Sequence, residues 1–310
     1  MTLAKSVGVL QEDPNAAPRK LLRQWYLRGG REYNRNGVDI FTKEWDNLII
    51  LDACRYDAFR DLCEFDGTLR KVQSRGSTSE EFVRGNFNGR IAYDTVIVSA
   101  NGYYDLLNED IARRRNTKEI DGEIHDFVRL YRNEYRDAAG GLTTHPKTVT
   151  EHALKANEAY PKKRLIIHYL QPHQPYLGPF AEEHIDYGHG MNIITTRNRN
   201  PHLTDADLHR AYMENLKLVL DEVETLLDAV RGKTVITSDH GELLGERLPV
   251  IPVKDYDHWY GLHVPELLNA PWFEIEGESR KEIREDTPAE RDEVDAEEVE
   301  QHLKDLGYRV

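Results

Sequence analysis

The chain contains 310 residues, of which 55 are Asp or Glu and 41 are Lys or Arg, so its formal net charge is -14 at pH 7. This length allows one large α/β domain or two small domains. The negative charge repels nucleic-acid phosphates, which excludes nonspecific binding of DNA or RNA. The same acidity suits a protein that stays hydrated in concentrated salt, and we therefore expect a salt-adapted, halophilic protein.

The cysteines and the hydropathy pattern bear on where the protein works. The two cysteines, Cys54 and Cys63, are too few for a disulfide framework in a chain of this length. Residues 1–18 contain no apolar signal core, and no apolar run approaches the length of a membrane span. We therefore expect a cytoplasmic protein without a transmembrane segment.

The first predicted element is an N-terminal helix over residues 18–29, which ends at a pair of glycines. Basic and aromatic residues are frequent between positions 19 and 35. Such a segment suits contact with a membrane or a partner. The net acidity of the chain disfavours strong binding to anionic lipids, so the expectation is a plain amphipathic surface helix.

Four short apolar runs follow and predict buried strands at residues 48–51, 95–98, 165–169 and 234–237. Between the last two lies a long segment, residues 205–230, whose apolar positions follow helical spacing. Strands that alternate with helices predict an α/β fold with a mainly parallel central sheet, flanked by helices on both faces. After residue 275 the sequence is rich in charge, and we expect a solvated acidic linker followed by a final helix and strand over 295–310.

Acidic and imidazole side chains follow three of the predicted strands. Asp52 ends the first, His173 comes shortly after the third, and Asp239 and His240 follow the fourth. Functional residues of open α/β sheets collect beyond the carboxyl ends of the strands. Asp and His are ligands that suit Zn, Mn or Mg. Taken singly, each of these residues also suits a helix cap or a turn, so the metal-site hypothesis depends on the whole set.

These segments resemble a known superfamily. The run Leu-Ile-Ile-Leu-Asp-Ala-Cys-Arg-Tyr-Asp at 48–57 resembles the first metal-binding strand of the alkaline phosphatase superfamily. Thr-Ser-Asp-His-Gly-Glu at 237–242 resembles its second metal-binding segment, and 303–308 resembles a C-terminus common among sulfatase-like members. The resemblance implies a three-layer α/β/α fold and a sulfatase-like catalytic domain over 41–275, between a leader and helix (1–40) and a C-terminal part (276–310) that packs back on the domain.

The resemblance also implies a covalent mechanism. Formylglycine sulfatases need a Cys-x-Pro-Ser-Arg motif, which is absent because Arg55 follows Cys54. The stretch at 74–82 is instead similar to the Gly-x-Thr-Ser stretch of lipoteichoic acid synthases, whose threonine is the nucleophile. By that match Thr78 is the expected nucleophile, with Ser77 second. The same residues, followed by two glutamates, also resemble a helix capping box, and the two interpretations are compatible.

The resemblance further implies a site residue by residue. The expected metal ligands are Asp52, Thr78, Asp239 and His240, holding Mn, Zn, Mg or Ca. Two histidines match family segments and would bind a second metal, hydrogen-bond the ester or protonate the leaving group. They are His173 and His258, and His258 is also counted among the metal ligands. His263 is the alternative to His258. Arg55, Asp57 and Arg75 flank this centre, where they suit an oxyanion clamp or structural ion pairs.

Three functions stay open at this stage. The first is a metal-dependent hydrolase of phosphate or sulfate esters that uses a threonine nucleophile. The second is a transferase that passes the same covalent intermediate to an acceptor alcohol, and the third is a binding protein that keeps the fold without the activity. The expected substrate is a small-molecule ester or an ester of a glycan or lipid head group.

Overall fold

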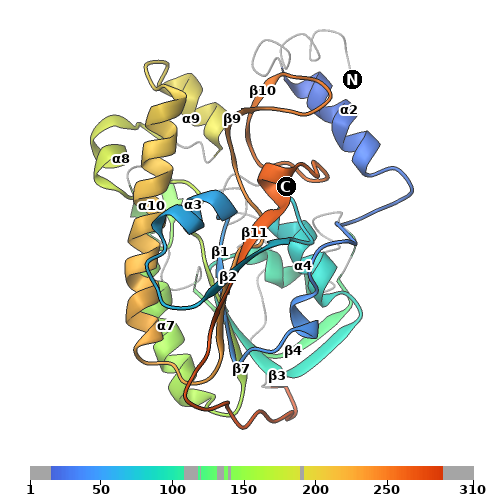
Figure 1. Cartoon of the computed structure of the whole chain (residues 1–310), viewed down its shortest axis with the longest axis vertical. Helices are drawn as coiled ribbons and strands as arrows, with labels where there is room; N and C mark the ends of the chain where they lie inside the picture. The colour runs from blue at the N-terminus through green and yellow to red at the C-terminus, as the bar shows by residue number, and fades with distance from the viewer. Residues whose placement is uncertain are drawn as a thin grey trace.

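The computed structural model of the chain describes residues 15–107, 118, 120–130, 136–138, 141–188 and 192–288. In this part of the chain, a seven-stranded sheet has the order β2-β11-β8-β1-β7-β3-β4. Figure 1 shows α7 and α10 to one side of this sheet and α4 to the other. The expected α/β architecture with a mainly parallel central sheet is confirmed.

The centre of the sheet is β1 (Asn47–Leu51), in which every residue is buried. It pairs in parallel with β7 (Arg164–Tyr169) and with β8 (Thr234–Thr237). All three strands were expected at nearly these positions, because a strand covered on both faces is a continuous apolar run. β3 (Arg90–Ser99) extends the parallel part beside β7 and is longer than the predicted apolar run.

The edges of the sheet were not predicted. β4 (Gly122–Arg129) pairs in parallel with β3, while β11 (Asn269–Ile275) runs antiparallel between β8 and β2 (Thr68–Gln73). The two edge strands, β2 and β4, lie partly in solvent, so their sequences carry no continuous apolar run. Two ribbons complete the strands: β5 (Arg136–Ala138) with β6 (Gly141–Thr143), and β9 (Leu243–Arg247) with β10 (Lys254–Asp257).

The longest described helix is α10 (Asp205–Leu227), which begins at a capping box formed by Thr204 and Asp207. It ends three residues before the expected limit at 230 and packs beside α7 (Pro146–Ala159). The remaining helices are short and connect the strands. They are η1 (Ile40–Thr42), α3 (Tyr56–Leu62), α4 (Ser79–Phe87), η2 (Gly102–Leu107), α8 (Pro179–His184), α9 (Ile193–Arg199) and α11 (Pro265–Leu268).

The N-terminal helix α2 (Ala16–Tyr26) packs on the domain rather than leading away from it. Leu22 belongs to a small buried cluster with residues of the 243–267 region, separate from the main core. Two glycines with positive φ, Gly29 and Gly30, follow the helix as expected. No described helix is long and apolar enough to cross a membrane. The cytoplasmic location and the proposed domain limits stay predictions.

The charged segment after β11 is solvated, but it is not a loose linker over its described part. Arg280 pairs with Asp46 at the amino end of β1, and Lys163 pairs with Asp286. These contacts fasten residues 276–288 to the amino edge of the sheet, which charge composition alone did not indicate. The helix and strand expected over 295–310 lie outside the described residues. Both cysteines are free thiols.

Candidate active site

Two buried aspartates meet at the carboxyl edge of the sheet. Asp52 follows β1 and Asp239 comes two residues after β8, and neither side chain is exposed. Since β1 and β8 are adjacent parallel strands, their carboxyl ends deliver the two carboxylates to one place. A carboxylate oxygen from each, and a ring nitrogen of His168, all lie within 4.8 Å of one another.

Two imidazoles face these carboxylates. The Nε2 atom of His240 lies 3.5 Å from Oδ1 of Asp52 and 3.4 Å from Oδ2 of Asp239. The Nε2 atom of His168 lies 3.7 Å from Oδ2 of each aspartate. His168 comes from β7 and was expected to be a core residue or to support the ligands from behind. The structure places it directly at the carboxylates instead.

The tautomer of His240 indicates what the centre can hold. Its Nδ1 atom is 2.8 Å from the carbonyl oxygen of Gly241, which can only accept a hydrogen bond, so Nδ1 carries the proton. Burial lowers the pKa of His240 below its ordinary value. A neutral His240 then directs the lone pair of Nε2 at two carboxylates, an arrangement that is repulsive unless a cation lies between them.

The charges around the two aspartates also indicate a site for a cation. Burial by itself would raise the pKa of Asp239, but His240, His168 and the Ser79 hydroxyl outweigh burial and lower it. Burial also lowers the pKa of His168 to about 4, so this imidazole is neutral at pH 7. Among the described residues, no Lys or Arg forms an ion pair with Asp239. Buried carboxylates that face imidazole ring nitrogens fit a divalent cation.

The hydroxyl of Ser79 contacts both carboxylates of this cluster. Its Oγ atom donates to Oδ2 of Asp239 at 2.6 Å and lies 3.5 Å from both Asp52 Oδ2 and His240 Nε2. The side-chain amide of Asn101, just beyond β3, donates to Ser79 Oγ and to Asp52 Oδ2, each at 3.0 Å. Ser79 is the first residue of α4, so its hydroxyl lies at a helix N-terminus.

The two hydroxyls expected at this place, those of Thr78 and Ser77, form hydrogen bonds with other groups. Thr78 is the N-cap of α4, and its Oγ1 accepts a hydrogen bond from the backbone N–H of Glu81 at 3.3 Å. Ser77 donates to the Trp259 carbonyl at 2.9 Å and also contacts the Glu81 carboxylate. In the described structure neither hydroxyl forms a hydrogen bond with Asp239, so the capping interpretation of Thr78 is the one that the structure supports.

A second cluster adjoins the first and comes from loops. His173, Glu242 and His258 are buried and each offers a ligand atom within 4.8 Å of the others. The Nδ1 atom of His258 lies 3.2 Å from Glu242 Oε1. The ring of His258 has its centroid 4.3 Å from that of His240 and 5.1 Å from that of His173. The structure therefore brings together both histidines expected from the sequence.

Burial and the neighbouring Asp257 raise the pKa of Glu242 well above its ordinary value. Burial also lowers the pKa values of His173 and His258. This second cluster is therefore less negative than the first and suits proton transfer or a further cation. Glu242 was not singled out beforehand, although it follows the Asp239-His240-Gly241 motif directly in the sequence.

The backbone around both clusters is held tightly. Ala53 and Asp257, which adjoin Asp52 and His258, have φ values of 59° and 76°. Residues other than glycine rarely adopt this region of backbone conformation. Gly241 lies against the segment at 266, where a Cβ atom would be 2.1 Å from the Glu266 carbonyl oxygen. Any side chain at 241 would therefore displace the loop that carries Asp239 and His240.

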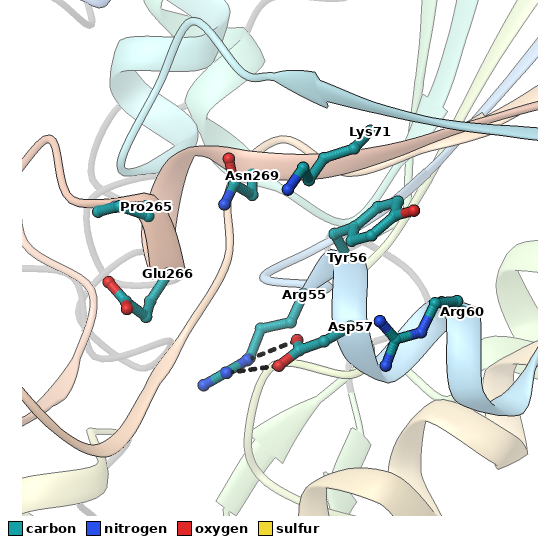
Figure 2. A pocket seen from close by; sticks show the side chains of 8 residues that line it. All are labelled: Arg55, Tyr56, Asp57, Arg60, Lys71, Pro265, Glu266 and Asn269. Carbon is teal, nitrogen blue, oxygen red and sulfur yellow. Dashed lines mark hydrogen bonds and ion pairs between the residues drawn. The ribbon is translucent and has the colours of Figure 1, made fainter.

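Other expected participants lie outside the two clusters. His263 bonds to Glu81 at 2.9 Å, and Arg75 lies 3.4 Å from Asp39, so both have structural partners. Arg55 pairs with Asp57 at 2.7 Å and with Glu246. Figure 2 shows this pair in a cavity of about 240 Å³ beside the basic side chains of Arg60 and Lys71. None of the metal-ligating candidates lines that cavity.

The fold and these side chains define an α/β protein with a candidate metal centre at the carboxyl edge of its sheet. No family model matches the chain, and no curated protein matches it significantly. Among solved structures it is similar to the zinc complex of the C-terminal periplasmic domain of EptC from Escherichia coli, with 14% identity and a TM-score of 0.46 over 78% of this chain and 76% of that chain.

Two further similar structures are a phosphonate monoester hydrolase from Silicibacter pomeroyi and a putative sulfatase from Bacteroides thetaiotaomicron. The hydrolase has 11% identity and a TM-score of 0.42 over 84% of this chain and 73% of that chain. The sulfatase has 12% identity and a TM-score of 0.43 over 90% of this chain and 72% of that chain. At these identities and TM-scores, the chemistry of this chain has to come from its own side chains.

Proposed function

We propose that this chain is a metal-dependent enzyme that cleaves phosphate or sulfate esters, with Ser79 as the nucleophile in place of the expected Thr78. The observation that carries the proposal is the 2.6 Å hydrogen bond from Ser79 Oγ to Asp239 within the buried carboxylate cluster. A hydroxyl in this place is surrounded by metal-ligand types and lies at a helix N-terminus, where a developing anion is stabilised.

Asp52, Asp239 and His240 would hold the cation, with His168 beside them. A divalent cation in this place supplies positive charge to the ester oxygens and lowers the pKa of a nearby hydroxyl. The donor set of carboxylate oxygens and imidazole nitrogens suits Zn or Mn, and also admits Mg or Ca. A second ion at His173, Glu242 and His258 is compatible with the same chemistry.

The protein side chains would perform the remaining work. Asn101 orients the Ser79 hydroxyl, and Asp239 Oδ2 is within reach of its proton. As Ser79 Oγ forms a bond to phosphorus or sulfur, the ester bond to the alcohol breaks, and the leaving oxygen takes a proton from the cluster of His173, Glu242 and His258, in which the raised pKa of Glu242 keeps a proton. Water then cleaves the serine ester and restores the hydroxyl. An acceptor alcohol in place of water would make the same site a transferase.

Three single substitutions separate the candidate nucleophiles. Ser79→Ala should lower kcat for an aryl phosphate by about 10³-fold or more, because no other hydroxyl of the described residues forms a hydrogen bond with the Asp239 carboxylate. Thr78→Val should keep kcat within about tenfold and cost about 1 kcal/mol of stability through the lost helix cap. Ser77→Ala serves as a second control. Each variant is assayed in high salt with Mn and Zn, and its metal content is measured by elemental analysis.

The metal content makes the outcome decisive. Ser79→Ala should still bind the metal, since Asp52, Asp239 and His240 remain. If Ser79→Ala turned over at the wild-type rate while Thr78→Val was inactive, the threonine would be the nucleophile and our assignment would be wrong. If no metal and no ester of either type gave turnover by the wild-type protein, the chain would be a binding protein. Product analysis with an added alcohol distinguishes hydrolysis from transfer.

A further inference from the structure

The N-terminal helix α2 has an inner face that is firmly attached to the domain. Arg19 forms a buried ion pair with Asp255 at 2.7 Å, and its guanidinium lies 3.6 Å from the centroid of the Trp259 ring. Leu22 lies one turn further along the helix and is buried in the small apolar cluster of the 243–267 region. The orientation of α2 on the domain is therefore fixed.

The outer face of α2 is both apolar and basic. Leu21 is 61% exposed and Trp25 is 51% exposed, and these residues lie one turn apart on the helix. Lys20 and Arg23 on the helix, and Arg28 and Arg31 just after it, are also exposed, and none of them forms an ion pair with a described carboxylate. The Arg28 guanidinium lies 4.6 Å from the Trp25 ring centroid.

The charge of this segment is opposite to that of the whole protein. Residues 15–31 contain five basic residues and no acidic one, in a chain whose net charge is -14. At physiological ionic strength, exposed charges that are more than about 8 Å apart are largely screened from each other. The basic residues of this segment therefore determine which charged surfaces the helix attracts. The acidic remainder of the protein would repel a nucleic acid. A flat anionic surface can instead bind by contact with this basic face alone.

The loop between β9 and β10 lies beside α2 and adds a further exposed apolar side chain. Val250 in this loop is 84% exposed, while its neighbours Ile251 and Val253 pack against the cluster that contains Leu22. Three of the four large exposed apolar side chains of the described residues therefore lie on α2 or on the loop that packs against it; the fourth, Ile91, is on β3. Figure 1 shows α2 and this loop together at one end of the molecule.

The same face is coupled to the candidate active site. The Arg23 guanidinium lies 5.3 Å from the Tyr260 ring centroid, and the Tyr260 hydroxyl donates to the Glu32 carbonyl at 3.0 Å. Tyr260 is two residues from His258, whose ring adjoins His240. The helix is therefore attached to the segment that supplies one histidine of the site.

We propose that the outer face of α2, with Val250, docks on an anionic lipid surface and presents the candidate active site to esters of lipid head groups. The exposed Leu21 and Trp25 would enter the interface while the basic side chains meet the lipid phosphates. The substrate class in this proposal rests on the proposed ester-cleaving function, but the docking does not. It revises the expectation of a plain surface helix.

Vesicle cosedimentation tests the docking. The full chain should bind vesicles of phosphatidylglycerol and phosphatidylcholine, and should bind pure phosphatidylcholine at least tenfold more weakly. Leu21→Ser/Trp25→Ser should lose at least tenfold in partitioning. Lys20→Glu/Arg28→Glu should lose about 25-fold or more, because each cation near an anionic surface contributes about fivefold. Ile91→Ser and Lys155→Glu/Lys217→Glu make the same chemical changes elsewhere and should change binding less than twofold.

Activity separates the two proposals. All variants should keep the wild-type rate on a dissolved aryl phosphate, while the two α2 variants should lose rate on a phosphate ester embedded in anionic vesicles. Equal vesicle binding by the wild type and the α2 variants would overturn the docking proposal. The proposal would also be wrong if the wild-type protein formed a concentration-dependent dimer that Leu21→Ser/Trp25→Ser abolishes and that lipid does not displace. Lipid-dependent binding without turnover of any ester would leave the docking standing and remove the proposed function.

Discussion

The two ends of β1 each carry a fully buried aspartate, and they are built in opposite ways. Asp46 precedes the strand and Asp52 follows it, and neither is exposed. Asp46 accepts hydrogen bonds from the Arg280 guanidinium and from the backbone N–H of Lys233, each at 2.7 Å. Asp52 is instead grouped with a second carboxylate, Asp239, and with imidazoles whose pKa values are lowered by burial.

This difference separates a structural carboxylate from a candidate functional one. A buried charge is costly unless it is paired, and the amino end supplies a permanent cation from the protein itself. At the carboxyl end, the chain concentrates negative charge and leaves the surrounding imidazoles neutral. Among the described residues no Lys or Arg forms an ion pair with Asp239, and a bound metal would provide the positive charge at this place.

The largest expected effect tests this contrast directly. Asp239→Asn keeps the shape of the side chain and its ability to accept from Ser79, but it removes one negative charge. We expect the rate of ester cleavage to fall by about 10³-fold and the bound metal to be lost. Asp46→Asn, the matched change at the other end, should keep metal content and rate while costing about 1–3 kcal/mol of stability. Elemental analysis and urea unfolding measure both; unchanged metal in Asp239→Asn would contradict the site.

Metal removal should have the next largest effect. A ligand that binds only the folded protein stabilises it by about 4 kcal/mol when present at 1,000 times its Kd. Treatment with a chelator should therefore lower the thermal midpoint of the wild-type protein and of Asp46→Asn, but not that of Asp239→Asn. Differential scanning calorimetry measures the shift. A midpoint that is indifferent to chelator in all three proteins would show that the folded chain holds no metal.

The pH dependence of stability isolates His168. Burial lowers its pKa from 6.5 to about 4 in the folded protein, so between these values the unfolded chain binds more protons. The free energy of unfolding of the chelated protein should therefore fall as the pH decreases from 6.5 to 4, with His168 contributing about 3 kcal/mol of this loss. In His168→Asn, which can still accept from Tyr104, the fall should be smaller by that amount. Equal slopes in urea unfolding at several pH values would contradict this.

The smallest effect is expected at the amino end. Arg280 is about half exposed, so its pair with Asp46 is partly screened by solvent. Arg280→Gln should cost about 1 kcal/mol of stability and leave rate and metal content unchanged. A loss of activity in Arg280→Gln would mean that the tail acts on the site, and the contrast between the two ends of β1 would no longer hold.

The central strands were predictable because burial on both faces leaves a continuous apolar run, as in Leu48–Leu51. The convergence of Asp52, Asp239 and His240 was predictable for a related reason, since parallel neighbours end at the same edge. The outer strands were not predictable, because no residue of the edge strand β2 is buried and its neighbour β11 runs antiparallel. Ser79, Asn101 and Glu242 were missed because each is an ordinary polar residue until the chain brings it beside a carboxylate.

The sequence by itself determined the α/β class, the buried strands and the acidic and imidazole residues that follow them, because apolar periodicity and strand ends are local properties of a chain. Only the tertiary structure decided which hydroxyl faces the carboxylates. Thr78 is the N-cap with an extended backbone, whereas Ser79 is the first helical residue, so one hydroxyl caps the helix and the next contacts the carboxylate cluster. Such a choice depends on where α4 begins relative to the sheet, and contacts between distant segments fix that position.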